Sequence, residues 1–165
     1  MVNPSAHDHA ETPVMQVASG CLLTDRVGNI LLVKPTYKPL WEVPGGAVER
    51  SESPLAACRR EVQEELGLDV MPTRILVVDY REPRPGQRDA ALRFIFDGGE
   101  LSPEQVASIE LNEQELSEYS FVRQCELADY LIPVLARRLQ ACLADGTRGY
   151  LEEGKPILGW QPGPA

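Results

Sequence analysis

The chain has 165 residues, the length of a single domain, and a domain of this size buries about 70% of the surface that its unfolded chain exposes. Its 16 basic and 25 acidic residues give a net charge of −9, which disfavours binding to long nucleic acid or to an anionic membrane. No segment has the length and apolarity of a membrane span, and we expect no signal peptide because the amino terminus lacks cationic and apolar regions.

The cysteines indicate a reducing compartment. None of the four stands in a C-x-x-C spacing, so a zinc site is not expected. We interpret them as reduced core residues of a cytoplasmic protein; they are Cys21, Cys58, Cys125 and Cys142.

The first elements in chain order are a leader and a hairpin. Residues 1–13 are polar and are predicted to be a disordered leader before a domain that spans residues 14–146. Residues 15–24 and 30–34 are apolar runs on either side of the turn residues 25–29, which predicts two strands joined as a hairpin.

A helix is predicted from Pro54 to Leu66. Ser53 is a good N-cap, Pro54 suits the first helical position, and Gly67 suits the left-handed residue after the last turn. The apolar residues within it recur at spacings of 3, 4 and 4 and are expected to face the core; they are Leu55, Cys58, Val62 and Leu66.

Three carboxylates gather on a different face of this helix. At about 100° per residue, Glu64 and Glu65 fall on either side of Glu61. They crowd one another in the last two turns, where the helix dipole disfavours acidic groups. A solvated helix face is the ordinary explanation of such a cluster, but a hard divalent cation, which prefers oxygen ligands, explains why the carboxylates stand together.

The spacing around these carboxylates is specific. Gly46 is followed after five residues by Glu52, and after seven more by Arg-Glu-Val-Gln-Glu-Glu-Leu-Gly-Leu at residues 60–68. This pattern matches every position of the Nudix box, so the chain resembles the Nudix hydrolase family closely over residues 46–68 and more loosely elsewhere. The resemblance implies an α/β fold, an α/β/α sandwich around a central mixed sheet, and metal-dependent hydrolysis of a nucleoside diphosphate linked to another group.

The resemblance also implies roles for single residues. The metal, Mg²⁺ or Mn²⁺ in its place, is expected to bind the carbonyl of Gly46 and the carboxylates of the box, Glu61, Glu64 and Glu65. Arg60 is expected to hold one of these carboxylates in position, and Glu52 is expected to be structural. We take Glu64, Glu65 and Arg60 as catalytic candidates.

Residues 74–81 and 91–96 are predicted strands joined by a proline-rich loop over residues 82–89. Aromatic and basic side chains around this loop are candidates for base stacking and phosphate contacts, and Trp41 is either a core residue or a wall of the pocket. The substrate-binding candidates are Trp41, Tyr80, Arg81 and Arg88, with Arg84 also in the loop. Pro83 lies near where ADP-ribose hydrolases of the family tend to carry a proline, which is a weak marker for that substrate.

An acidic segment over residues 104–120 precedes a short apolar run at 121–122. Family members often place a further acidic residue here as an extra metal ligand or general base. Glu118 fits best, with Glu115 second, and Glu65 is the alternative base within the box.

The last predicted helix covers residues 133–145, after a short turn at 126–130, and ends at Gly146. Residues 147–165 form a predicted tail that packs on the domain or on a second subunit. A homodimer is left open.

A phosphoanhydride hydrolase acting on a small nucleoside diphosphate derivative is the prediction. Whether the substrate is a nucleoside triphosphate or a nucleotide sugar such as ADP-ribose is left open. The alternative is a non-catalytic nucleotide sensor on the same fold, and an isomerase is remote because the isoprenoid isomerases of this fold depart from the box that is intact here.

Overall fold

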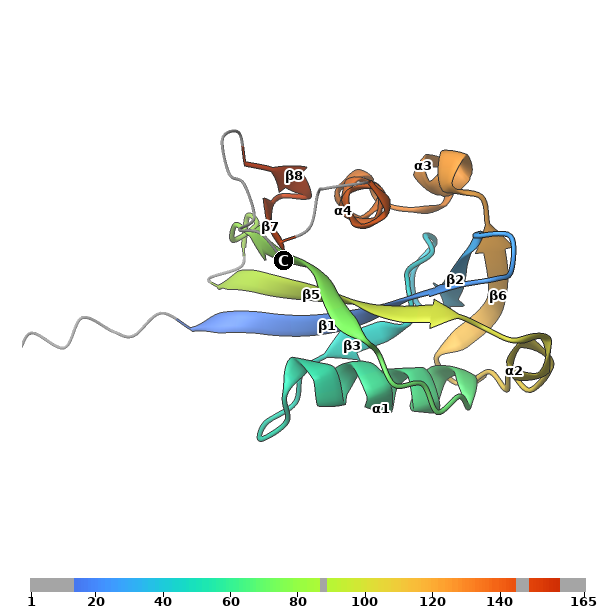
Figure 1. Cartoon of the computed structure of the whole chain (residues 1–165). Helices are drawn as coiled ribbons and strands as arrows, with labels where there is room; N and C mark the ends of the chain where they lie inside the picture. Colours follow the sequence, from blue (N-terminus) through green and yellow to red (C-terminus); the bar gives the residue numbers. More distant parts are fainter. Residues whose placement is uncertain (1–13, 87–88, 145–148, 158–165) are drawn as a thin grey trace, which may run out of the picture.

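The computed structural model describes residues 14–86, 89–144 and 149–157. Within these residues eight strands form one mixed sheet with helices on both of its faces (Figure 1). The strands are β1 (Met15–Thr24), β2 (Ile30–Pro35), β3 (Gly45–Ala47), β4 (Arg74–Arg81), β5 (Ala90–Glu100), β6 (Leu116–Val122), β7 (Gly149–Glu152) and β8 (Lys155–Pro156). The helices are α1 (Pro54–Leu66), α2 (Pro103–Ala107), the 3₁₀ helix η1 (Gln124–Glu126), α3 (Leu127–Tyr130) and α4 (Pro133–Leu143).

The strands follow the order β6-β2-β1-β5-β4-β7-β8, and β3 pairs with β1 beside β2. The pairs β1–β5 and β4–β7 are parallel and the others are antiparallel. Helix α1 covers one face, and α3 and α4 lie over the other (Figure 1). The predicted α/β/α sandwich with a mixed sheet is confirmed.

Helix α1 begins and ends where the sequence predicts. The Ser53 hydroxyl accepts a hydrogen bond from the Ala56 N–H, and Gly67 adopts a φ of 71°, the left-handed conformation of a helix end. One predicted core position is wrong, because the side chain of Leu55 is 38% exposed. Ala57 is fully buried instead.

Two hydrophobic cores lie between the sheet and its helices, one on each face of the sheet. Cys58, Val62 and Leu66 of α1 pack against one face, and Leu135 and Leu139 of α4 pack against the other. Three of the four cysteines are buried as predicted, whereas Cys125, in the 3₁₀ helix η1, is exposed, so its assignment to the core is wrong. No helix in the described part of the chain is both long and apolar enough to span a membrane.

The region after α4 adds two short strands to the sheet. Helix α4 ends at Leu143, and residues 149–157 contain β7, which pairs in parallel with β4, and β8, which pairs with β7. The short helix α2, capped by the Ser102 side chain, was not predicted. The predicted leader at residues 1–13 lies outside the described residues.

Candidate active site

Arg60 on α1 joins the box carboxylates to the loop before the helix. Its Nη1 donates to Glu61 Oε1 at 3.0 Å and to Glu64 Oε2 at 2.8 Å. Its Nε and Nη2 donate to the two carboxylate oxygens of Glu52, at 3.2 and 2.8 Å, and Nη2 also donates to the carbonyl of Ala47 on β3. These contacts raise the pKa of Arg60, so the guanidinium stays charged and fixes the positions of three carboxylates.

Glu65 lies one turn further along α1 and is buried, with 7% of its surface exposed. Its Oε2 accepts a hydrogen bond from the N–H of Gly45 at 2.8 Å. Burial raises the pKa of Glu65 to about 8. The hydrogen bond from Gly45 lowers this pKa, whereas the negative charges of Glu61, Glu115 and Glu42 raise it further. The surroundings of this carboxyl group therefore carry excess negative charge.

Gly46 lies directly against Glu61. A Cβ atom at Gly46 would be 2.3 Å from Glu61 Oε1, so any larger residue at this position would displace the Glu61 carboxylate. Burial raises the pKa of Glu61, although the neighbouring Arg60 partly offsets this effect. The backbone of β3 and the carboxylates of α1 thus meet at the edge of the sheet, where β3 pairs with β1.

In the described part of the chain, no three acidic, histidine or cysteine side chains are arranged as a ready set of metal ligands. Glu61 and Glu64 are turned toward Arg60, and Glu65 toward the amide of Gly45. The site still fits a hard divalent cation. Its carboxylate oxygens carry excess negative charge, and the neighbouring backbone of Gly45 and Gly46 has no side chain that would keep an ion away from the carbonyl oxygens.

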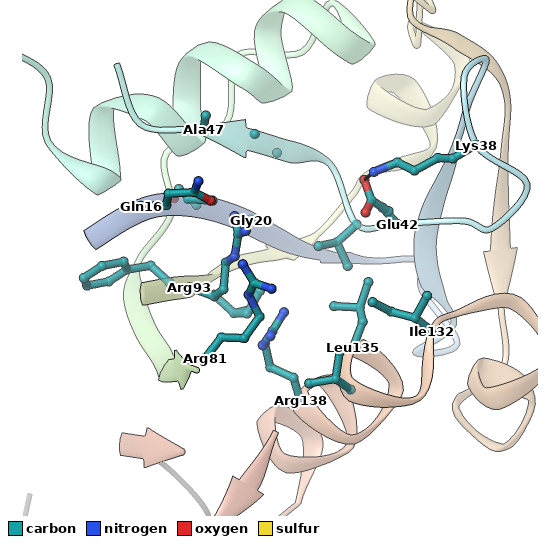
Figure 2. A pocket seen from close by; sticks show the side chains of 18 of the residues that line it. Gln16, Gly20, Lys38, Glu42, Ala47, Arg81, Arg93, Ile132, Leu135 and Arg138 are labelled. Carbon is teal, nitrogen blue, oxygen red and sulfur yellow. Dashed lines mark ion pairs between the residues drawn. The ribbon is translucent and has the colours of Figure 1, made fainter. Parts of the chain in front are cut away.

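A cavity of about 410 Å³ opens on the other side of β3, between the sheet and α4 (Figure 2). Gly45, Gly46 and Ala47 form one edge of it, and Ala18 and Gly20 of β1 form part of its floor. The β3 backbone therefore separates the cavity from the carboxylates of α1 and belongs to both. A substrate in this cavity would lie beside the Nudix-box loop.

The predicted substrate-binding residues divide into two groups. Arg81 lines the cavity and is buried, and Arg84 also lines it. Tyr80 does not line the cavity, since neighbouring strand residues point to opposite faces of the sheet. Trp41 packs edge-on against Tyr130, with 5.6 Å between the ring centroids, and does not line the cavity either.

Arg88, the last of the predicted set, lies outside the described residues.

Two of the four arginines that line the cavity were not predicted. Arg93 on β5 and Arg138 on α4 both line the cavity. A signal for each was present, because Arg93 interrupts an apolar strand run and Arg138 stands at helical spacing from Leu135 and Cys142 on an otherwise apolar face. A charged residue on an expected core face indicates either a buried ion pair or a binding site.

The acidic candidates outside the box are also separated by the fold. Glu118 lies on β6, half-exposed, and its Oε1 is 2.7 Å from the Nζ of Lys34 on the neighbouring strand. Glu115 lies just before β6, and its charge is among those that raise the pKa values of Glu61 and Glu65. The structure therefore places Glu115 near the box carboxylates and places Glu118 in a salt bridge with Lys34.

Comparison with known proteins agrees with this arrangement of carboxylates and cavity. The family model described as the NUDIX domain matches residues 14–142. The chain belongs to the NUDIX domain family.

The 8-oxo-dGDP phosphatase NUDT18 of Danio rerio is 33% identical to this NUDIX chain over 111 residues, which are 66% of this chain and 32% of that protein. The 8-oxo-dGTP diphosphatase of Proteus vulgaris is 35% identical over 66 residues, 38% of this chain and 58% of that protein. The chain thus spans about a third to three fifths of the length of these relatives.

A similar fold is found in the crystal structure of the MutT protein from Methanosarcina mazei Go1. It superposes with a TM-score of 0.62 at 26% identity and covers 76% of this NUDIX chain and 88% of that chain.

Proposed function

We propose that this NUDIX chain hydrolyses a phosphoanhydride bond in a nucleoside diphosphate linked to a second group, such as a nucleotide sugar or a nucleoside triphosphate. The observation that carries the proposal is the network in which Arg60 holds Glu61 and Glu64 on one side of β3, while a cavity of about 410 Å³ lies on the other side of that strand. The relatives named as a phosphatase and a diphosphatase of oxidised guanine nucleotides support the same reaction class.

The proposed metal is Mg²⁺, or Mn²⁺ in its place, held by the carbonyl of Gly46 and the carboxylates of Glu61, Glu64 and Glu65. The fit rests on the donors themselves, which are hard oxygens, and on the raised pKa of Glu65, whose burial among other carboxylates favours a nearby cation. When bound, such a metal neutralises diphosphate oxygens and makes the attacking water more acidic.

The protein residues have separate tasks in this proposal. Arg60 is a positioning residue, because it contacts the carboxylates and the β3 backbone rather than the cavity. The cations of the cavity attract the anionic substrate despite the net charge of −9. Water adds to one phosphorus, and the bridging oxygen leaves with the other phosphate, so that two phosphate monoesters are released from a nucleotide sugar.

A general base must reach the attacking water, and two of the three candidates lie close to the metal-binding carboxylates. Glu65 is buried beside Gly45, and Glu115 acts electrostatically on Glu65 and Glu61. We therefore favour Glu65 and Glu115 over Glu118, which is half-exposed and bound to Lys34. The test is a pH–rate profile of the Glu115→Gln and Glu118→Gln variants. The variant that lacks the base should lose the acidic limb, in which activity falls as the base is protonated, and an acidic limb that is kept in both variants would assign the base to Glu65.

A hydrolysis screen tests the proposal as a whole. The purified protein is incubated with Mg²⁺, and separately with Mn²⁺, and offered nucleoside triphosphates, ADP-ribose, other nucleotide sugars and dinucleoside polyphosphates. We expect cleavage of at least one compound, and we expect EDTA to abolish it. A folded protein that binds a nucleotide but cleaves nothing in the panel would contradict the proposal and support the sensor alternative.

We further propose a cytoplasmic location and a small-molecule substrate rather than long nucleic acid or a membrane. The location is supported by the four cysteines, which are all free thiols. A homodimer stays a prediction, and analytical ultracentrifugation tests it.

A further inference from the structure

Three arginines converge in the cavity from three different elements. The register pairs Asp79 with Arg93 and Arg81 with Ala91, so the side chains of Arg81 and Arg93 leave β4 and β5 on the face that looks toward α4. Arg138 points down from α4 to the same place, and Figure 2 shows the three guanidinium groups gathered in the middle of the cavity. We call Arg81, Arg93 and Arg138 the arginine cluster.

The carboxylates near the arginine cluster are already used by other groups. Asp79 is fully buried, and its Oδ2 lies 2.6 Å from Nη2 of Arg138 while its Oδ1 accepts a hydrogen bond from the N–H of Gly154. Glu42, which among the described residues is the one acidic side chain lining the cavity, lies 2.6 Å from the ammonium group of Lys38.

Arg93 has no ion-pair partner of its own within 4.0 Å among the described residues, and the charges of Glu42 and Asp79 offset only part of the effects that disfavour its positive charge. Burial lowers the pKa of Arg93, and the charges of Arg81 and Arg138 lower it further, which means that its charge is unfavourable in the structure without a ligand. The Arg138–Asp79 pair suffices to tie α4 to the sheet, so the fold alone does not require a further arginine at position 93.

The chemistry of the cluster points to an oxyanion. A guanidinium group offers planar, paired donors that match phosphate and carboxylate oxygens, and a partly buried position strengthens such contacts. Flat surfaces for stacking a base are scarce by comparison. Of the aromatic residues that line the cavity, Tyr37 is 75% exposed and Phe94 stacks on Phe96.

The position of the cluster separates it from the Nudix-box loop. Strands β3, β1, β5 and β4 are successive neighbours in the sheet, so the backbones of β5 and β4 lie roughly 10 and 14 Å from β3 at the usual strand spacing. A diphosphate bound beside Gly46 is shorter than this separation between backbones, and the arginine side chains extend from β5 and β4 into the space beyond it. A second anionic group on the same substrate would reach the cluster.

We propose that the arginine cluster binds a second anionic group, a phosphate or a carboxylate, carried either by the nucleoside or by the group that the cleaved diphosphate joins to it. This inference rests on the hydrolase activity proposed above and narrows the range of substrates expected for it. The preferred substrates are nucleoside diphosphate derivatives that carry a further negative charge away from the scissile bond, and Arg93 is the specificity-determining residue.

Matched substrate pairs test the proposal. ADP-ribose and its 2′-phosphate share one diphosphate and differ by one phosphate, and UDP-glucose and UDP-glucuronate differ by one carboxylate. We expect kcat/KM to be about tenfold or more higher for the charged member of at least one pair, as charge-assisted hydrogen bonds imply. The first pair reports on phosphate and the second on carboxylate. Equal kcat/KM values in both pairs would overturn the proposal.

Variants locate the effect. Arg93→Gln removes the charge and should lower kcat/KM much more for the charged member of a pair than for the uncharged member, so that the preference is lost. Arg93→Lys keeps the charge and should restore part of the preference. Arg26→Gln, at an exposed position in the turn between β1 and β2, is the control and should keep the full preference. A preference that survives unchanged in Arg93→Gln contradicts the assignment to the cluster.

A binding experiment separates this proposal from the proposed activity. Isothermal titration in EDTA measures the affinity of ADP-ribose and of its 2′-phosphate, and of UDP-glucose and UDP-glucuronate, without turnover. Tighter binding of a charged member, lost in Arg93→Gln, supports the arginine cluster even if no compound is hydrolysed. Equal binding within both pairs overturns it even if hydrolysis is observed. The far-ultraviolet circular dichroism and the Tm of each variant are measured alongside, and Arg93→Lys decides the outcome if Arg93→Gln does not fold.

Discussion

Arg138 on α4 and Asp79 on β4 form an ion pair inside the protein, with 2.6 Å between Nη2 and Oδ2. Only 9% of the arginine side chain and none of the aspartate side chain is exposed. Asp79 also accepts a hydrogen bond from the N–H of Gly154, in the turn between β7 and β8. One carboxylate therefore connects the sheet, the helix above it and the strand pair after that helix.

Asp79→Asn should destabilise the protein strongly. The variant leaves Arg138 buried without its counter-charge, and removing one partner of a buried pair costs about 3 to 5 kcal/mol. Urea denaturation should show a loss of free energy of unfolding in this range. Asp97→Asn is the control, because its partner Arg74 is 48% exposed and such pairs contribute less than about 1 kcal/mol. Similar losses in the two variants would contradict the role given to Asp79.

The thiols should differ sharply in reactivity. Cys125 is exposed, whereas Cys21, Cys58 and Cys142 are buried, and burial raises the pKa of Cys142 to about 12. In the native protein, 5,5′-dithiobis(2-nitrobenzoic acid) should react rapidly with one thiol out of four. After unfolding in guanidinium chloride all four should react, and Cys125→Ser should remove the rapid phase. Rapid reaction of a second thiol in the native protein would contradict the packing of α1 or α4 on the sheet.

The sequence predicts α1 and its carboxylates well because their determinants are local. The cap at Ser53, the left-handed Gly67 and the period of the apolar residues all lie within one segment, and the contact of Arg60 with Glu64 follows from i,i+4 helical spacing. Leu55 is the exception, since its apolar spacing fits the core face while its side chain is left 38% exposed by tertiary packing, which the helical period does not encode.

The cavity could not be predicted in the same way, because long-range pairing builds it. Arg138 and Asp79 are 59 residues apart, and only the packing of α4 on β4 brings them together. The register of the strands decides which other side chains reach the cavity. Arg81 faces the cavity and Tyr80 does not, although the two are neighbours in the chain. The same holds for the acidic segment, where the pairing of β6 with β2 places Glu118 opposite Lys34.

Arg60→Gln should lower kcat/KM about 10- to 100-fold, the usual effect of losing a residue that orients metal ligands. The glutamine cannot hold Glu52, Glu61 and Glu64 together, so the concentration of Mg²⁺ needed for half-maximal activity should rise. The matched control is Arg59→Gln on the same helix, since Arg59 pairs with Asp69 at 3.2 Å on the exposed side. Equal effects in the two variants would indicate a general loss of charge on α1 rather than the positioning of carboxylates.

Glu64→Gln should lower the activity of the protein without lowering its stability. The Glu64 side chain is 54% exposed, so the variant should unfold at nearly the same temperature as the wild type in EDTA, while its kcat falls by about 100-fold or more. Because a ligand that binds only the native state raises Tm, Mg²⁺ should stabilise the wild type more than the variant. Glu113→Gln, at an exposed position of the loop before β6, is the control and should behave as the wild type in both measurements. If Glu64→Gln keeps full activity and the full Mg²⁺-dependent rise in Tm, the carboxylates of α1 do not hold the catalytic metal.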